Sequence, residues 1–385
     1  PASGMGGDVA CLRGWHPALA KAELKTLLPN AEIRSSNAPR LVTVSDTTSE
    51  QQQAALLVAS GLQCFLTGGR FHAWAGNQSK LLEEVEEYLS EHKVEGSVAV
   101  VPWRQEGKIK GCSTSTLAGA IGGILHRMGY SIDLEKPDHR MGLVADGQSE
   151  SLAYGWMQGE GTASFTSRGR RASERPFFKP VSLDPRLARL AVNLAAGPVN
   201  SGPIVDPMTG TGGFIIEASL SGREGLGLDI NSEMVQGANM NLKWAHEGLE
   251  PPTCHIKRGD ATHLPHLLPV PYMGKVAGFV LDPPYGRNSH GSMENEALLE
   301  AVLCSAHDVA NPSAGFVVIL PIHPMGERIH EAVELNESVD LLHGDWHGLQ
   351  SMMVRTGWHP TSAHVEHVHR SLSRLVLLAR YAPLD

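Results

Sequence analysis

The sequence of 385 residues contains few cysteines, few aromatic side chains and no long apolar run. Its five cysteines are scattered singly, without a Cys-x-x-Cys pair that would clamp zinc or run redox exchange, so we expect free thiols in a reducing compartment. No stretch approaches the roughly 20 apolar residues that a membrane span needs. The first ten residues lack the basic and apolar segments of a signal peptide, and we therefore expect a cytoplasmic protein.

Positive charge is also in deficit, with 32 Lys and Arg against 41 Asp and Glu, for a net charge of -9. Such a chain repels a polyanion at long range unless its cations are gathered locally. It contains no fixed-period repeat and no low-complexity block, and its length predicts two or three globular domains. Any nucleic-acid site must therefore be a patch on one of them.

The first 95 residues mix short apolar runs with helical pieces, which predicts an α+β module. A helix is expected over 81–92, where Leu81, Leu82, Val85 and Leu89 fall on one face. A different residue pattern follows. It predicts a strand over 98–103, a polar hairpin-like stretch, a helix over 115–128, and strands over 140–145 and 151–156 around the turn Asp146-Gly147. A linker over 159–185 ends this half.

After residue 183, short apolar strands alternate with Ala-rich helices, which predicts a doubly wound parallel sheet in a Rossmann-like domain. The expected strands are 203–205, 225–230, 255–257, 276–281 and 315–320, and a terminal hairpin of 363–368 and 375–381 should close the sheet edge. Helices are expected to begin near Gly213, Ser232, Glu294 and Met325.

The first strand-to-helix turn, residues 205–213, reads Val-Asp-Pro-Met-Thr-Gly-Thr-Gly-Gly. Glycine lets the backbone approach a ligand closely, and the start of the helix adds a positive dipole end. Asp229, at the end of the second strand, is placed to accept both hydroxyls of a ribose, or else to cap the helix that follows. Asp260, after the third strand, is either an acceptor for an adenine amine or a simple loop aspartate.

The turn begins with Asp206-Pro207 and lacks the Gly-x-Gly-x-x-Gly spacing that closes on a pyrophosphate, which favours S-adenosylmethionine over NAD. Asp206 is the expected partner of the ammonium group at the aminoacyl end. The predicted cofactor-binding residues are Asp206, Thr209, Gly210, Gly212, Asp229, Ile230, Asp260 and Ala261.

Residues 281–287, Leu-Asp-Pro-Pro-Tyr-Gly-Arg, follow the fourth strand at the ligand-binding edge of the predicted sheet. An exocyclic base amine is a poor nucleophile, because its lone pair is delocalised into the ring. The Asp282 carboxylate and the Pro283 carbonyl can accept its N–H groups and aim the lone pair at a methyl group. Pro284 stiffens the backbone and Tyr285 offers a ring for an extruded base, although an ordinary Pro-Pro turn is the alternative. These four are the predicted catalytic residues.

With this motif the sequence resembles the Asp-Pro-Pro-Tyr amino-methyltransferases, and specifically the archaeal THUMP-domain tRNA (guanine(10)-N2)-methyltransferases and dimethyltransferases. Residues 174–180, Glu-Arg-Pro-Phe-Phe-Lys-Pro, and 183–189, Leu-Asp-Pro-Arg-Leu-Ala-Arg, match the stretch before the catalytic domain of that family. Residues 97–156, including Asp-Leu-Glu-Lys-Pro-Asp at 133–138, look like a THUMP domain. The family often has an aromatic residue and a cysteine where this chain has Met208 and Thr209.

The resemblance implies a ferredoxin-like α+β module over 1–95, a THUMP RNA-binding core over 96–158, a linker over 159–183 and a Rossmann-like methyltransferase domain over 184–385. It implies S-adenosylmethionine-dependent methylation of the N2 amine of guanosine 10 in tRNA, giving N2-methyl- and then N2,N2-dimethylguanosine. Alternatives are a THUMP methyltransferase acting on another tRNA guanosine, such as position six, or on ribosomal RNA. A non-catalytic RNA-binding module is a more remote alternative, and a dehydrogenase is the most remote.

Residues 164–190 carry seven cations against two carboxylates, which is the local patch that an acidic RNA-binding protein needs. The predicted RNA-binding residues are Lys108, Lys110, Arg168, Arg170, Arg171 and Arg175, each alternatively a solvated surface cation. We expect Phe177 and Phe178 to pack at a domain junction. The expected partner is tRNA, with no obligatory protein partner, no membrane and no metal, although four histidines gather at His359, His364, His367 and His369.

Overall fold

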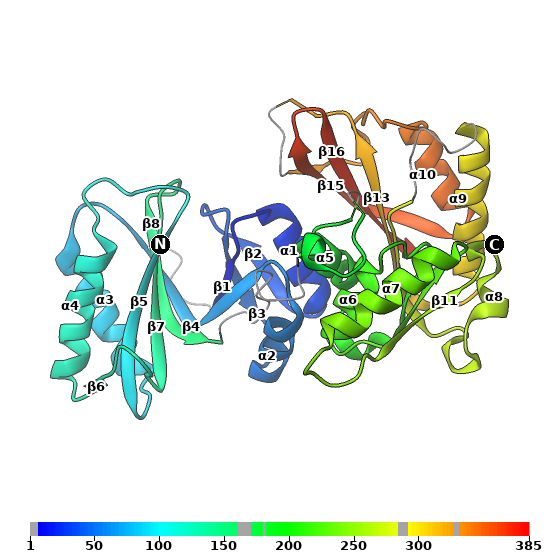
Figure 1. The fold of residues 1–385 in the computed structure, drawn as a ribbon. Helices are drawn as coiled ribbons and strands as arrows, with labels where there is room; N and C mark the ends of the chain where they lie inside the picture. Colours follow the sequence, from blue (N-terminus) through cyan, green and yellow to red (C-terminus); the bar gives the residue numbers. More distant parts are fainter. Residues whose placement is uncertain (1–6, 160–170, 180–181, 284–291, 327–330, 385) are drawn as a thin grey trace. The chain divides into compact units, whose positions relative to one another are not determined.

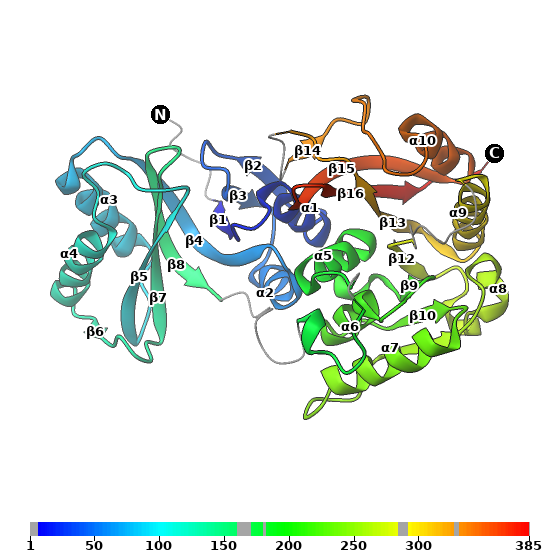
Figure 2. The same ribbon diagram turned by 45° about the horizontal axis from the view of Figure 1, so that its top comes forward.

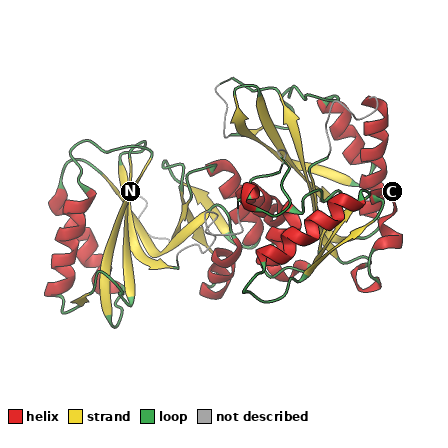
Figure 3. Ribbon diagram, in the orientation of Figure 1, coloured by secondary structure: helices red, strands yellow, loops and turns green. Residues whose placement is uncertain are grey.

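The computed structural model describes residues 7–159, 171–179, 182–283, 292–326 and 331–384. The chain divides into two units, one made of Pro1–Pro17, Asn30–Leu56 and Leu62–Thr162, the other of Ala18–Pro29, Leu57–Gly61 and Ala163–Asp385. In each unit helices pack on a sheet (Figure 1, Figure 3). None of the helices in these ranges combines the length and the apolar character needed to cross a bilayer.

The first unit contains one continuous sheet in the order β2-β3-β1-β4-β8-β7-β5-β6. Its strands are β1 (Asp8–Leu12), β2 (Glu32–Ser35), β3 (Leu41–Ser45), β4 (Leu62–Ala73), β5 (Ser97–Gln105), β6 (Ser131–Ile132), β7 (His139–Asp146) and β8 (Ser151–Gln158). Its helices are α2 (Ser49–Val58), whose last two residues belong to the second unit, α3 (Gln78–Glu91) and α4 (Thr114–Arg127). The long strand β4 joins two halves of the sheet, because it pairs with β1 on one side and β8 on the other.

The apolar face expected on α3 is present, and Leu81, Val85 and Leu89 are fully buried on it. Tyr88 joins them, and its hydroxyl accepts from the Trp156 N–H at 2.8 Å. The stretch after β5 differs from the hairpin-like stretch that the sequence predicts. It forms no hairpin, because β5 pairs in parallel with β7 and the chain passes from β5 into α4.

The second unit contains the predicted doubly wound sheet, in the order β11-β10-β9-β12-β13-β16-β15-β14. Its strands are β9 (Ile204–Asp206), β10 (Gly225–Asp229), β11 (Cys254–Arg258), β12 (Val276–Leu281), β13 (Ala310–Ile322), β14 (Ala332–Val333), β15 (Trp358–His369) and β16 (Leu372–Tyr381). The strands from β9 to β13 are mutually parallel, and β16 is antiparallel to β13. Strand β12 is buried along its whole length, as a strand covered on both faces must be.

Helices cover both faces of this sheet (Figure 2). On one face lie α5 (Pro185–Ala196), α6 (Gly213–Leu220) and α7 (Ser232–Ala245), and on the other α8 (Leu264–Leu267), α9 (Ser292–His307) and α10 (Trp346–Arg355). The chain moves outward from β9 to β10 and β11 and then returns to β12 on the opposite side of β9. The loops after β9 and β12 therefore diverge, which creates the crevice where such sheets bind ligands.

Two expectations at the end of the chain were wrong. In the described residues after Met325 no helix begins before Trp346, where the Asp345 side chain accepts from Gly348 N at 2.6 Å and caps α10. The β15–β16 hairpin does form, but the outer edge of the sheet is the short strand β14, which pairs with β15. Both differences arise in connections, where local apolar patterns are weakest.

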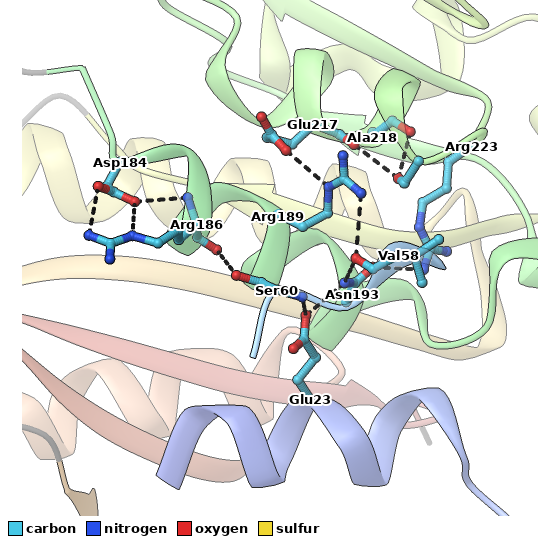
Figure 4. Close-up of polar contacts among 11 residues, drawn as sticks. Glu23, Val58, Ser60, Asp184, Arg186, Arg189, Asn193, Glu217, Ala218 and Arg223 are labelled. Carbon is cyan, nitrogen blue, oxygen red and sulfur yellow. Dashed lines mark hydrogen bonds and ion pairs between the residues drawn. The ribbon is translucent and has the colours of Figure 1, made fainter. Parts of the chain in front are cut away.

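Two segments from the N-terminal part of the chain belong to the second unit, and one of them is most of α1 (Pro17–Leu27). The buried carboxylate of Glu23 accepts from Ser60 N at 2.8 Å, Gly61 N at 2.7 Å and the Asn193 side chain at 2.7 Å (Figure 4). Asn193 also donates to the Val58 carbonyl at 2.9 Å. These contacts hold both segments against α5.

A buried ion pair fastens α5 to α6. Arg189 Nε lies 3.0 Å from Glu217 Oε2, and both side chains are almost completely buried (Figure 4). A pair removed from water in this way costs desolvation free energy, and it persists because each charge neutralises the other. The pair fixes the helix that follows the Gly-rich turn.

Candidate active site

The ends of β9 and β12 bring Asp206 and Asp282 to the switch point of the sheet. The preceding residues, Val205 and Leu281, pack into the core beneath α9, so alternation along a strand turns both aspartates toward the α5 face. Gly278 of β12 identifies the face of the sheet that packs on α5. A Cβ atom added to this glycine would lie 2.8 Å from the backbone of Ala195. The two predicted carboxylates are thus brought to the same face of the same edge.

Their surroundings differ. Asp206 is completely buried, and burial, with added repulsion from Asp229 and Asp282, raises its pKa to about 8. Asp282 is partly exposed, and burial raises its pKa to about 6 while the positive charge of Arg374 opposes that rise. At neutral pH the protein therefore presents Asp282 largely ionised, whereas Asp206 needs a cation to ionise fully.

The Gly-rich turn is shaped by left-handed glycines and by Asp229. Gly212 has φ of 84° and starts α6, and Gly210 has φ of 50° with open space where a Cβ would stand. The Asp229 carboxylate accepts from Gly210 N at 3.0 Å and from Asn231 N at 2.8 Å. The side chain that caps α7 is that of Asn231, so Asp229 holds the turn in place instead of serving as the cap.

One oxygen of the buried Asp206 carboxylate has no partner. Oδ1 accepts from Met208 N at 3.3 Å, but Oδ2 has no hydrogen bond within the described part of the chain. The Thr209 hydroxyl beside the turn also lacks a partner of hydrogen-bonding geometry there, although it lies near enough to Asp206 to oppose the rise of its pKa. Orphaned buried acceptors of this kind mark a place for a ligand that carries hydrogen-bond donors or positive charge.

The remaining predicted cofactor residues follow β10 and β11, which are adjacent. Ile230 has 66% of its surface exposed beyond the end of β10. Asp260 caps the turn Ala261–His263 by accepting from Thr262 N at 3.0 Å, and the hydrogen bonds from Thr262 lower the pKa of this carboxyl. Ala261 is buried beneath it. Asp260 is thus an ionised acceptor at the same edge, although part of its bonding capacity is used within its own turn.

A strap formed by residues 175–179 runs beside the Gly-rich turn, and the residue that holds it there was not predicted from the sequence. Asn241 of α7 is completely buried. Its side chain accepts from Phe177 N at 2.9 Å and donates to the carbonyls of Phe177 at 2.8 Å and Thr211 at 2.9 Å. Phe177 packs against Gly237 of the same helix, and Phe178 is exposed. Nothing near Asn241 in the sequence signals this role.

The predicted RNA-binding residues fall in different places. Lys108 and Lys110 are exposed in the first unit, and Arg171 is exposed 3.9 Å from Glu174. Arg175 departs from the expectation, because it is only 4% exposed and its guanidinium nitrogens are buried without partners in the described residues. A buried guanidinium cannot contact an RNA backbone without moving first.

Four predicted residues, Pro284, Tyr285, Arg168 and Arg170, lie outside the described residues. Sequence reasoning also missed a pair of charged residues at the same edge as Asp282. Glu366 and Arg374 come from β15 and β16, which are far from the catalytic motif in sequence, and only strand pairing brings them near it. Within the described residues, no group of three or more His, Cys, Asp or Glu side chains is arranged to hold a metal ion.

The family model described as "RMKL-like, methyltransferase domain" matches residues 172–338, which span the strap, the Gly-rich turn and the end of β12. The second unit is thus an α/β methyltransferase domain. Among solved structures, the chain is similar to the crystal structure of TrmN from Thermus thermophilus at 19% identity, with a TM-score of 0.47 over 97% of this chain and 99% of that one.

Among curated relatives, the tRNA (guanine(10)-N2)-dimethyltransferase of Pyrococcus abyssi is 30% identical over 306 residues, which are 77% of this chain and 83% of the relative. The chain belongs to this family. The protein of the same name from Methanothermobacter thermautotrophicus is 41% identical over 36% of this chain and 38% of its own length. That from Methanocaldococcus jannaschii is 40% identical over 33% and 36%.

Proposed function

We propose that the protein transfers methyl groups from S-adenosylmethionine to the N2 amine of guanosine 10 in tRNA, giving N2-methyl- and then N2,N2-dimethylguanosine. The observation that carries the proposal is the position of Asp282 at the switch point, beside the orphaned carboxylate of Asp206, in a chain of this family. The two carboxylates supply an amine-binding acceptor and a cofactor-binding acceptor at one sheet edge.

The residues present fit S-adenosylmethionine. The unpartnered Oδ2 of buried Asp206 suits the ammonium group, Asp229 suits the ribose hydroxyls, and Asp260 suits the adenine amine beside exposed Ile230. Gly210 leaves open space in the turn for the aminoacyl end, and Thr209 and Gly212 flank it in the same turn. When bound, the cofactor supplies an electrophilic methyl group on its sulfonium.

Asp282 and Pro283 would act on the amine. The ionised carboxylate and the Pro283 carbonyl accept its two N–H groups, which holds the nitrogen and directs its lone pair at the methyl carbon. Formation of the N–C bond would accompany cleavage of the S–C bond, the Asp282 carboxylate would stabilise the positive charge on nitrogen, and one amine proton would then leave through that carboxylate to solvent. After the first transfer a single N–H remains, so the second transfer requires room for one methyl group beside one of the two acceptors.

The first unit would bind the RNA. We propose that residues 96–158 form a THUMP-type domain, following a ferredoxin-like module over 1–95, and that exposed Lys108 and Lys110 contact phosphates. Contacts of this kind position a substrate without reading its sequence. The linker over 159–183 would then lead into the catalytic domain over 184–385.

The test is transfer of labelled methyl groups from S-adenosylmethionine to unmodified tRNA transcripts that carry guanosine or adenosine at position ten. We expect label on the guanosine transcript alone. Equal label on both transcripts would move the target to another guanosine, such as position six, and label on ribosomal RNA alone would move it to another substrate. The absence of both label and cofactor binding would favour a non-catalytic RNA-binding module.

A further inference from the structure

An ion pair stands at the ligand-binding edge of the sheet outside the predicted site. Arg374 of β16 and Glu366 of β15 are directly opposite in the antiparallel register. Arg374 Nη1 lies 3.4 Å from Glu366 Oε2, and the two side chains are 19% and 12% exposed. The contact is long, and no other hydrogen bond of Arg374 lies within the described residues, so most guanidinium donors are available to a ligand.

This pair lies on the same face as Asp282. Arg380, six residues after Arg374 on the same strand, donates to the Ala195 carbonyl of α5 at 3.3 Å. Because side chains alternate between the two faces along a strand, Arg374 lies on the same α5 face as Arg380. Glu366 is directly opposite Arg374 and therefore lies on that face too. Asp282 also faces α5, because the adjacent Leu281 points into the opposite core.

The strand order places Arg374 between Asp282 and Glu366, because β16 lies between β12 and β15 in the sheet. Leu281 is level with Val318 of β13, and Arg374 is level with Pro321 of the same strand. Arg374 therefore stands two strands from β12, about 10 Å across the sheet, and slightly further toward the carboxyl edge. An arginine side chain bridges much of that span, and its charge does lower the pKa of Asp282.

Stability alone explains the pair poorly. The pair is mostly buried, and burying a charged carboxylate costs desolvation free energy that offsets the attraction between the two charges. Burial does raise the pKa of Glu366. The nearest other charges at this edge, Asp184 and Arg186, already pair with each other at 3.1 Å. An under-coordinated Arg–Glu pair beside a catalytic carboxylate is suited to binding a polar ligand.

We propose that Arg374 reads the Watson–Crick edge of the target guanine by donating to O6 while Asp282 accepts from the 2-amine, and that Glu366 holds the guanidinium of Arg374 in position. This inference rests on the proposed function. The 2-amine and O6 lie on one edge of guanine, and enzymes that act on extruded bases read that edge. Adenine has an amine at the position of O6, which would set a donor against the guanidinium, and it lacks the 2-amine.

The test uses tRNA transcripts with guanosine, 2-aminopurine or 2,6-diaminopurine at position ten. All three bases have a 2-amine and can be methylated, but only guanine has O6 and the N1 proton. Wild-type protein should prefer guanosine by at least about 100-fold in kcat/KM, because a site built for hydrogen bonds rejects an analogue that lacks them. In Arg374→Met and Glu366→Gln the preference should fall below about tenfold, mainly through loss of activity on guanosine.

Two further variants make the test decisive. Arg374→Lys keeps the charge without the planar fork and should regain part of the preference. Arg355→Met breaks a comparable pair, Arg355 Nε with Glu300 Oε1 at 2.7 Å in the same unit, and should leave the preference unchanged. Thermal unfolding and S-adenosylhomocysteine binding establish that each variant is folded.

The outcomes separate the two proposals. If wild-type protein methylates guanosine 10 but folded Arg374 and Glu366 variants keep the wild-type preference, or lose activity equally on all three bases, this inference is overturned and the proposed function stands. If wild-type protein methylates no guanosine transcript, the proposed function is overturned and this inference with it.

Discussion

At the residue scale, Asp206 and Asp282 end neighbouring strands, and their environments give them different tasks. Complete burial raises the pKa of Asp206 to about 8, so this carboxyl ionises fully at neutral pH only when a cation binds beside it. The smaller rise at Asp282, to about 6, keeps an ionised acceptor at neutral pH. Sequence reasoning placed both residues at the edge, but it could not assign these states, because desolvation depends on the elements that pack over each carboxyl.

We predict that Asp282→Asn lowers kcat/KM for methyl transfer by about 100-fold or more, since the variant loses the charge that stabilises the reacting nitrogen. Binding of S-adenosylhomocysteine and of tRNA should change less than about threefold, because the contact matters mainly during reaction. Steady-state kinetics and calorimetry measure both. Asp308→Asn, at an exposed position in the same unit, is the control, and wild-type turnover in Asp282→Asn would exclude the role.

We predict that S-adenosylhomocysteine binds more tightly as pH rises from 6 to 8, by up to about tenfold per unit, because the ammonium requires ionised Asp206 and binding releases its proton. The raised pKa also means that the stability Asp206 contributes to the free protein is lost as pH rises through about 8. Calorimetry in two buffers of different ionisation enthalpy reports the proton. An Asp206→Asn variant that keeps the same pH dependence would contradict this assignment.

At the element scale, strands that carry unbroken apolar runs were predictable to within a few residues, and β12 matches its expected bounds. The connection after β13 was not, because short polar loops leave no periodicity to read. The cations of residues 164–190 show the same limit. Arg189 pairs with buried Glu217, and Lys179 lies 3.1 Å from Glu233. A sequence gives the number of charges but not their partners, so part of the expected patch is already neutralised.

The strap beside the Gly-rich turn gives a prediction at this scale. Asn241→Leu should destabilise the protein by about 2–4 kcal/mol, because it leaves buried backbone groups of Phe177 and Thr211 without partners. It should also weaken S-adenosylhomocysteine binding, since Thr211 belongs to the turn. Urea unfolding and calorimetry measure the two effects.

The matched control is Asn239→Ala, an exposed position on the same helix that should cost less than about 1 kcal/mol. Equal effects at positions 239 and 241 would show that the strap is not fastened by Asn241. Loss of stability with unchanged cofactor affinity would separate the strap from the turn.

At the scale of the whole molecule, the boundaries between the two units do not coincide with the points where the residue pattern of the sequence changes. Glu23 and the 57–61 segment belong to the methyltransferase unit through Asn193, and β4 pairs with both halves of the first sheet. These contacts join residues that are between about 50 and 170 positions apart in the sequence, and no local motif indicates them. The methyltransferase motifs, in contrast, are local turns, which is why the candidate site could be placed from sequence.

We predict that Lys108→Gln combined with Lys110→Gln weakens tRNA binding and reduces the slope of log affinity against log salt by about 1–2. The slope falls because fewer counterions are released from the RNA when fewer phosphates are contacted. S-adenosylhomocysteine affinity should not change, since both residues lie in the first unit. Filter binding across a salt series measures the slope. The control replaces Lys243 and Lys275, which are exposed in the second unit, and an equal loss there would indicate a general charge effect.

Methylation should fall on one atom of one nucleotide, and fragment mapping of tRNA by mass spectrometry after incubation with S-adenosylmethionine tests this most directly. We predict that the fragment containing guanosine 10 gains the mass of one and then two methyl groups with wild-type protein, and none with Asp282→Asn. Methylation of a different fragment, or equal methylation by Asp282→Asn, would contradict the account.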